Sequence, residues 1–297
     1  MKRDLKKNYA IYLMLLPAII YYIAFHYLPM YGAQIAFKNF DPKSGIWGSE
    51  WVGLKHFVTF FQSYYFTRLL RNTILLSFYD ILFGFPAPVL LAILINEIRK
   101  KWFKKTVQTL SYLPHFISTV VVCGMIVDFV STEGVINEIV KLFGGNPVSF
   151  LSFPQYFRIV YIVSEIWRQV GWGSIIYLAS ISNIDQQLYE AATIDGAGRF
   201  RQMISVTIPG IAPMIIVLLI LRVGNLMTLG ADKILLLYNP SIYETADVIS
   251  TFVYRKGLLE GSYSYSTAVG LFNSVVNFIL LISVNKISKK VSENSLW

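Results

Sequence analysis

Apolar residues gather into six long stretches, which are separated by segments of varied length that carry most of the charges. The stretches cover residues 10–31, 72–95, 107–130, 157–181, 205–229 and 265–285. Each has about 21 to 25 residues, which at about 1.5 Å rise per residue is enough to cross a hydrocarbon core of about 30 Å with some tilt. The pattern therefore predicts an all-α polytopic membrane protein with six transmembrane helices.

The composition agrees with a membrane location. Hydrophobic residues make up 55% of the 297 residues and charged residues 14%, against about 25% charged in an ordinary soluble domain. The net charge of +9 is distributed between the apolar stretches and does not form one basic face, so lipid headgroups are the expected partner of this charge. The lipid bilayer is thus the predicted environment, and nucleic acid is not a predicted partner.

The basic residues also predict the orientation. If the N-terminus is cytoplasmic, the cytoplasmic segments contain 14 Lys and Arg, and the outside segments contain 9 over nearly twice the length. Lys and Arg accumulate on the cytoplasmic side of membrane proteins. Both termini are therefore predicted to lie in the cytoplasm.

The segments outside the stretches divide the chain into three parts. Residues 1–71 are predicted to form a cytoplasmic tail, the first transmembrane helix and an extracellular loop. Aromatic residues within 54–70 of that loop favour a helix at the outer membrane interface, as an anchor or as a docking surface for an outside partner. Residues 72–285 are predicted to form a core of five helices, and residues 286–297 a cytoplasmic tail.

The chemistry of an enzyme or an energy source is missing. The sequence contains no G-x-x-x-x-G-K-[ST] phosphate-binding loop. Its three histidines have no Cys or carboxylate at metal-ligand spacing, and its single cysteine, Cys123, lies in an apolar stretch. The chain is therefore predicted to be non-catalytic, without a metal site and without a nucleotide of its own.

The segment 186–209 is neither apolar enough to span a membrane nor polar enough to be a plain linker. It predicts a helix, a turn at Gly196 and Gly198, where glycine allows positive φ, and a second short helix that ends at Pro209. Glu190 precedes two alanines, which let another surface approach the backbone while the carboxylate pairs with a cation. On physical grounds the segment either docks on another protein or rests on the membrane.

The same segment resembles the EAA loop of ATP-binding-cassette (ABC) importer permeases, and residues 186–209 are called the EAA loop below. The loop pattern is E-A-A, three residues, G, nine residues and I-x-L-P; Val206 and Ile208 replace its I and L but keep their apolar character. The form with Asp195, Gly196 and Ala197 is similar to that of carbohydrate permeases. The positions that match in place are Glu190, Ala191, Ala192, Gly196 and Pro209.

Further segments resemble the branch of this family that serves oligosaccharides. They are residues 36–40, 51–54, 96–97 and 112–116. The resemblance implies a subunit in a bacterial cell membrane that imports an oligosaccharide. It also implies four kinds of partner: a second permease subunit, two ATPase subunits, an extracellular sugar-binding protein and the sugar itself.

By the same resemblance, ATP and Mg²⁺ belong to the partner ATPase. The helix around residues 190–201, including Arg199, is implied to be the coupling helix that fits into a cleft of that ATPase. Its movement would rock the two membrane halves between inward-open and outward-open states.

Polar residues inside the stretches are candidates for the solute pathway, because such groups are costly in a bilayer unless they have a use. Glu165 and Arg168 are three residues apart on one helical face and are expected to form a buried ion pair or to line the pathway. Asn273 and Asn277 are expected to join helices, and Pro86 and Pro88 to break the second span. The candidate pathway residues are Glu165, Trp167, Arg168, Trp172, Tyr177, Arg222 and Asn225.

Other classes remain open at this point. A membrane-embedded enzyme of glycan or lipid metabolism would need a convergent set of acid, base or metal groups near one membrane face. An ion-driven carrier would usually need more spans or an internal repeat. A permease for a solute that is not a sugar would satisfy the same EAA loop.

Overall fold

The computed structural model describes residues 8–292, and the side chains of residues 8–290. The basic residues Lys2, Arg3, Lys6 and Lys7, which contribute to the predicted orientation, lie outside this range. The chain is mostly helical, and its residues form two compact units. Unit 1 comprises residues 1–63 and 252–272, and unit 2 comprises residues 64–251 and 273–297. The two units are defined by which residues lie close together in space. The division at residue 71 concerns the membrane boundary and stays a prediction.

Unit 1 begins with a continuous helix, Tyr9–Phe37, which contains the first predicted span. None of its most apolar window is buried within this chain, as expected of a helix that faces lipid or another protein. Its parts are α2 (Tyr9–Tyr22), η1 (Ile23–Tyr27), α3 (Leu28–Met30) and η2 (Tyr31–Phe37).

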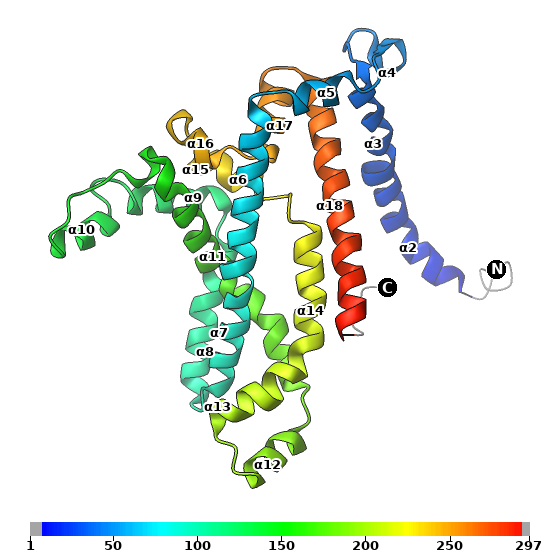
Figure 1. Cartoon of the computed structure of the whole chain (residues 1–297). Helices are drawn as coiled ribbons and strands as arrows, with labels where there is room; N and C mark the ends of the chain where they lie inside the picture. The colour runs from blue at the N-terminus through cyan, green and yellow to red at the C-terminus, as the bar shows by residue number, and fades with distance from the viewer. Residues whose placement is uncertain (1–7, 293–297) are drawn as a thin grey trace. The chain divides into compact units, whose positions relative to one another are not determined.

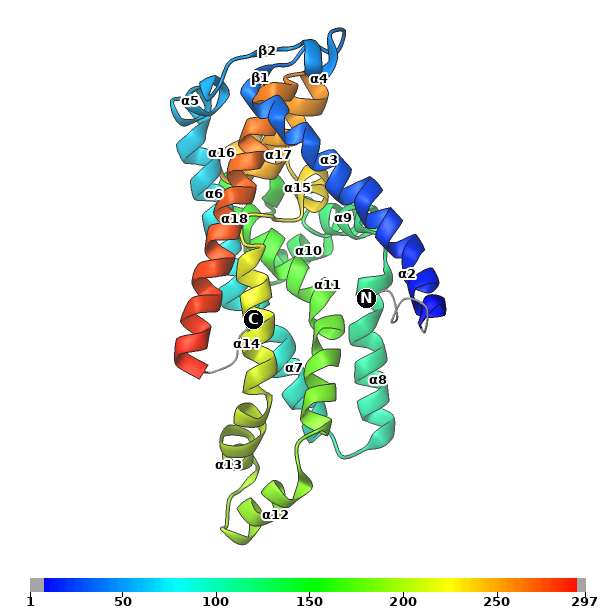
Figure 2. The same cartoon turned by 90° about the vertical axis from the view of Figure 1, so that its right-hand side faces the viewer.

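The loop after this helix contains the strands of unit 1. Strands β1 (Lys38–Asn39) and β2 (Glu50–Trp51) pair antiparallel, with α4 (Gly45–Gly48) between them; Figure 2 shows the strands beside each other. The prediction of an all-α protein thus misses a two-stranded ribbon. The rest of unit 1 includes η8 (Arg255–Leu259) and the first part of α18 (Tyr263–Ser292), while α17 (Ile249–Tyr254) continues from one unit into the other.

The predicted interfacial helix at 54–70 is shorter than expected. Helix α5 (Lys55–Phe61) ends where the backbone and hydroxyl of Ser63 both donate to the carbonyl of Phe60, and a new helix begins at Tyr65. Phe60 is fully buried and its ring packs near those of Phe252 and Phe272. Residues 65–70 of the aromatic segment are therefore the start of the next long helix.

The second predicted span is one continuous helix, Tyr65–Glu97, in unit 2. It comprises α6 (Tyr65–Tyr79), the π-helical turn η3 (Asp80–Gly84) and α7 (Pro86–Glu97). The expectation that Pro86 and Pro88 break it is wrong, because Pro86 occupies the first position of α7, where no amide donor is needed. The amide of Phe85 still donates to the carbonyl of Asp80 at 2.9 Å, which keeps the turn helical.

The third predicted span, 107–130, is not a straight helix. Its parts are α8 (Lys101–Tyr112), η4 (Leu113–Phe116) and α9 (Thr119–Phe129), and the helices meet at 102° (Figure 2). The bend arises because Ile117 is extended and the Ser118 hydroxyl caps a new helix by accepting from the amide of Val121. Periodicity alone does not reveal such a break.

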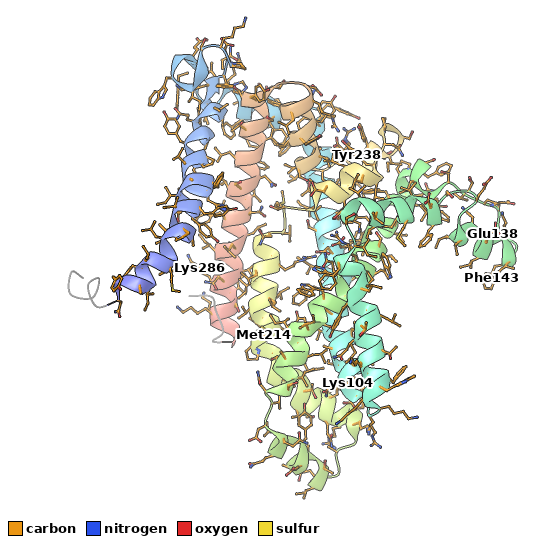
Figure 3. All side chains as sticks on the ribbon, turned by 180° about the vertical axis from the view of Figure 1, so that it is seen from behind. Lys104, Glu138, Phe143, Met214, Tyr238 and Lys286 are labelled. Atoms are coloured by element: carbon orange, nitrogen blue, oxygen red, sulfur yellow. The ribbon has the colours of Figure 1, made fainter. Side chains whose placement is uncertain are left out.

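An arm follows α9 and contains α10 (Val135–Leu142) and η5 (Phe150–Ser152). Buried Asn137 closes the arm, since its amide nitrogen donates to the carbonyls of Ser131 and Val148 and its oxygen accepts from the amide of Val148. Glu138 and Phe143 lie at the far end of this arm (Figure 3).

Helix α11 (Pro154–Ser182) is the centre of unit 2 and runs along α7 (Figure 1). One buried apolar cluster joins it to α9 and to α15 (Ala231–Leu237), and another joins it to α7 and α14 (Ile208–Gly224). Gly171 allows a close approach to α8, since a Cβ at this position would overlap the carbonyl of Ser111. Helix α11 thus holds the other helices of unit 2 together.

The fifth predicted span begins earlier and ends earlier than expected. A continuous helix covers Arg199–Gly224 and comprises α13 (Arg199–Gln202), η6 (Met203–Thr207) and α14. Residues 225–230 form no regular helix. The remaining elements of unit 2 are α12 (Gln186–Ile194), η7 (Pro240–Ile242), α16 (Tyr243–Ala246) and the later part of α18.

By length and composition, four helices among the described residues are long and apolar enough to cross a membrane, and five if the bent pair α8–α9 counts as one. Helix α11 has sufficient length but carries Glu165, Arg168 and Gln169 near its middle. The chain is accordingly a mostly helical protein with several apolar helices of membrane-spanning length.

Candidate functional site

The break at residues 225–230 is held in place by side chains from two other helices. Ser77 of α6 donates to the carbonyl of Leu226. Asn277 of α18 accepts from the amide of Met227 at 2.9 Å, and Asn273 donates to the carbonyl of Met227 at 3.2 Å. The two asparagines predicted to join helices therefore do so by binding backbone groups that the end of α14 leaves unpaired.

A polar cavity of about 310 Å³ lies beside this break, between α6, η3, α11, α14 and α15. Charged groups between apolar helices are expensive, so they mark a functional site or a buried pair. Six lining residues are charged: Asp80, Glu165, Arg168, Arg222, Asp232 and Lys233.

The first ion pair of the cavity joins the second span to the fifth. The Nε and Nη2 atoms of Arg222 lie 2.8 and 2.5 Å from the same carboxylate oxygen of Asp80. The π-helical turn η3 supplies Asp80, and the last turn of α14 supplies Arg222. The Asp80 side chain is 11% exposed and that of Arg222 49%, so this pair reaches the cavity surface.

The second ion pair joins α11 to α15 and is more deeply buried. The ammonium of Lys233 lies 2.8 Å from the carboxylate of Glu165, and their side chains are 3% and 18% exposed. Lys233 also donates to the carbonyl of Tyr161 at 3.0 Å and lies 4.7 Å from its ring centre. These contacts supply the partners that a buried ammonium requires.

The ion pair expected between Glu165 and Arg168 is not present. Lys233 forms the ion pair with Glu165, because α15 packs against the part of α11 that carries Glu165. Among the described residues Arg168 makes no hydrogen bond or ion pair, and its Nε atom is buried without a partner. Glu165 and Arg168 share one helix face but do not form an ion pair, because Lys233 occupies the carboxylate of Glu165.

The structure brings four of the predicted pathway residues to the cavity: Glu165, Arg168, Arg222 and Asn225. Asn225 donates to the carbonyl of Leu221, and its side-chain oxygen is left for the cavity.

The aromatic candidates lie elsewhere. Trp167 lines a separate apolar cavity of about 490 Å³, Trp172 stacks on His115 at 4.6 Å, and Tyr177 is buried in the apolar cluster of α7, α11 and α14.

Sequence reasoning missed Asp80, Lys233 and Asp232 as lining residues. Asp80 had a signal, since it is a carboxylate inside an apolar stretch. Lys233 and Asp232 had none, because they follow the fifth stretch and look like loop residues.

The EAA loop forms helix α12 and a turn that leads to α13. Both helices lie at the same end of unit 2 (Figure 1). Asp185 caps α12 by accepting from the amide of Gln187 at 2.9 Å. Gly196 has a φ of +74° and the Gly198 φ is −68°, so Gly196 alone needs the freedom of glycine. The amide of Ala197 donates to the carbonyl of Ala192 at 2.8 Å and closes the helix end.

Two side-chain contacts join α12 to the long helix 199–224, and a third joins this helix to the turn after α12. The hydroxyl oxygens of Tyr189 and Thr207 are 3.0 Å apart, and Gln202 donates to Thr193 and to the carbonyl of Ala197. The predicted short second helix is therefore the first turn of the fifth span. This continuous helix extends about 39 Å from Arg199 to Gly224.

The outer surface of the EAA loop is suited to bind another protein. Glu190, Ala191, Asp195 and Gly196 are exposed, as are Arg199 and Pro209. Ile194 and Phe200 are 86% and 72% exposed, and the sequence analysis did not select them. Arg199 also lies 3.7 Å from Glu97 at the end of α7. Large apolar side chains exposed on one surface are typical of a site that binds another protein.

Comparison with known proteins identifies the family. The model of the family described as "Binding-protein-dependent transport system inner membrane component" matches residues 64–293. Two relatives of Bacillus subtilis (strain 168) are each 47% identical: "Protein LplB", over 99% of this chain and 92% of that protein, and "Polygalacturonan/rhamnogalacturonan transport system permease protein YteP", over 97% and 90%.

Solved structures agree. The chain is similar to one chain of a bacterial ABC transporter "involved in the import of the acidic polysaccharide alginate", with a TM-score of 0.90, 46% identity and 98% coverage of both chains. It is also similar to a chain of the alginate transporter in complex with an "alginate pentasaccharide-bound periplasmic protein", with a TM-score of 0.92, 45% identity and 99% coverage of both chains.

These findings confirm the resemblance that the EAA loop indicates, and they explain why a membrane protein without a phosphate-binding loop carries a docking surface. The family is one of membrane components whose ATPase is a separate subunit. The chain belongs to the binding-protein-dependent transport system inner membrane components, and it is a non-catalytic permease subunit of an ABC importer.

Proposed function

We propose that this permease forms half of the pathway for an oligosaccharide, which an extracellular binding protein delivers and a separate ATPase drives across the membrane. The observation that carries the proposal is the polar cavity beside the helix break at 225–230. Broken helices that expose polar groups inside a membrane are the usual construction of a transport site. The names of YteP and of the alginate transporters support a sugar polymer as the solute class.

The orientation belongs to the same proposal. Six crossings with both termini in the cytoplasm require that α11 counts as a span although it is charged, and that the bent pair α8–α9 crosses together. Lys104 lies toward the end of unit 2 that carries the EAA loop, and Tyr238 and Glu138 toward the other end (Figure 3). This arrangement fits the excess of basic residues expected on the cytoplasmic side.

Energy coupling follows from the continuous helix 199–224. The ATPase holds ATP and Mg²⁺ and binds the EAA loop through Glu190, Ala191, Ala192, Asp195, Gly196, Ala197 and Arg199. When the ATPase dimer closes, α12 moves, and the contact between Tyr189 and Thr207 carries the motion into the helix whose last turn contains Arg222. A displaced Arg222 changes the cavity, because its partner Asp80 belongs to a different helix.

The pathway is tested by uptake of a labelled oligosaccharide into proteoliposomes that contain the whole transporter and its binding protein. Asn225→Ala removes a cavity amide that holds no other helix, and we expect uptake to fall several-fold while the complex assembles normally. Asn183→Ala, an exposed asparagine after α11, is the matched control and should transport at the wild-type rate. Unchanged uptake by the Asn225 variant would contradict the cavity as the pathway.

A further inference from the structure

We infer that the cavity selects sugars that carry a carboxylate, uronic acids, and that Arg168 is the residue that recognises this group. The inference rests on the proposed function, since it requires the cavity to lie on the solute pathway. Its evidence is the distribution of charge among the six ionic residues that line the cavity.

Four of these six residues neutralise one another. Asp80 pairs with Arg222, and Glu165 pairs with Lys233. The second pair is nearly closed to solvent, and the ammonium of Lys233 has further partners on Tyr161. Neither carboxylate is therefore left as a fixed negative charge toward a passing solute.

Arg168 is the cation that remains. It lies three residues after Glu165 on α11 and lines the same cavity. In the part of the chain that the structure describes, none of its donors has a protein acceptor, and its Nε atom is enclosed. A guanidinium has five N–H donors and stays protonated. A half-buried guanidinium without a protein acceptor is left to water or to an acceptor from outside the chain, and an anion also compensates its charge.

The sixth charge, Asp232, does not cancel it. Asp232 is exposed, near the start of α15, whereas Arg168 is partly enclosed with a buried Nε atom. A solvated charge acts through a high dielectric and is screened by salt, while a partly enclosed one is screened much less. Arg168 is therefore the least compensated charge among the residues that line the cavity.

A uronate carboxylate fits this site better than a hydroxyl group does. The carboxylate accepts two parallel hydrogen bonds from a guanidinium and also compensates its charge. A neutral sugar supplies only hydroxyl acceptors and leaves the charge uncompensated, and sites with fixed charged donors discriminate strongly against ligands without the matching group. Arg168 is thus a specificity-determining residue within the pathway.

The test uses the assembled transporter without its binding protein, so that selectivity of the binding protein does not enter. The probes are trigalacturonate and its carboxyl-reduced, neutral form, and equilibrium dialysis measures their binding. We expect the wild-type complex to bind trigalacturonate and Arg168→Gln to bind it about 10- to 100-fold more weakly. Binding of the neutral probe should be weak and unchanged. Arg168→Lys keeps the positive charge but cannot donate two parallel hydrogen bonds. Its affinity for trigalacturonate should lie between those of the wild type and Arg168→Gln.

The matched control is Arg71→Gln, an exposed arginine of α6 outside the cavity, which should bind both probes as the wild type does. Equal binding of both probes by the wild type, or no binding of trigalacturonate, would overturn the inference. A loss that is the same for both probes in Arg168→Gln would show a structural role. The uptake assay distinguishes failure of the proposed function from failure of this inference. If the cavity is not the pathway, Asn225→Ala transports at the wild-type rate, whatever affinities the Arg168 variants show.

Discussion

The ammonium of Lys233 and the carboxylate of Glu165 lie 2.8 Å apart although 68 residues separate them in the chain. This pair connects the helix that follows the break at 225–230 to the central helix of unit 2. Breaking a buried pair by removing one partner leaves an uncompensated charge in a medium that solvates it poorly. The pair therefore holds α15 in place on one side of the cavity.

We expect Lys233→Met to destabilise the protein by about 3 to 5 kcal/mol, which is the cost of leaving Glu165 buried without its partner. Thermal unfolding of the purified complex in detergent measures the effect. The double variant Lys233→Met with Glu165→Met removes both charges and should recover most of the stability. A double variant as unstable as the single one would mean that Lys233 acts through its contacts with Tyr161 instead.

Gly196→Val should disturb the EAA loop without affecting the apolar helices. At a φ of +74° a side chain with a Cβ costs about 1 to 2 kcal/mol, and a β-branched one costs more. We expect weaker co-purification of the ATPase and reduced uptake at normal membrane insertion. Gly198→Ala is the control, because Gly198 has a φ of −68° and open space where a Cβ would lie. Equal defects in both variants would contradict this reading of the turn.

Glu190→Lys distinguishes docking on an ATPase from resting on the membrane. If Glu190 pairs with a cation of the ATPase, its reversal removes a contact worth about 1.5 to 3 kcal/mol and adds repulsion, so less ATPase should co-purify. On an anionic membrane surface the added charge would strengthen contact by about 1 kcal/mol. The exposed Asn183→Lys adds charge just before α12 and should leave ATPase attachment unchanged. Normal attachment and uptake in Glu190→Lys would remove the support for the coupling role.

The proposed orientation is tested with single cysteines in a Cys123→Ser background, since the native thiol is buried. Glu50→Cys should react in intact cells with a thiol reagent that does not cross membranes. Arg201→Cys should react only after the membrane is made permeable. The opposite pattern would invert the topology and would place the EAA loop outside the cell, out of reach of an ATPase.

The features that were predictable from the sequence are those that depend on residues near one another in the chain. The long apolar stretches lie mainly within long helices because an apolar helix needs only its own residues to satisfy its backbone in lipid. The turn at Gly196 was predictable because the αL conformation is a property of one residue. The EAA pattern is also local, and the comparisons confirm the family that it indicates.

The tertiary structure decided what depends on packing between distant segments. The bend of 102° after Phe116 and the early end of α14 at Gly224 both interrupt predicted apolar stretches, and at the second of them Asn277 of another helix accepts from the amide of Met227. A predicted apolar stretch runs across each of these breaks, so hydropathy does not mark them. The partners of Asp80 and Glu165 were likewise decided by which helices pack together. A charge in a low-dielectric interior binds the nearest counter-charge in space, and spacing along one helix does not identify that group.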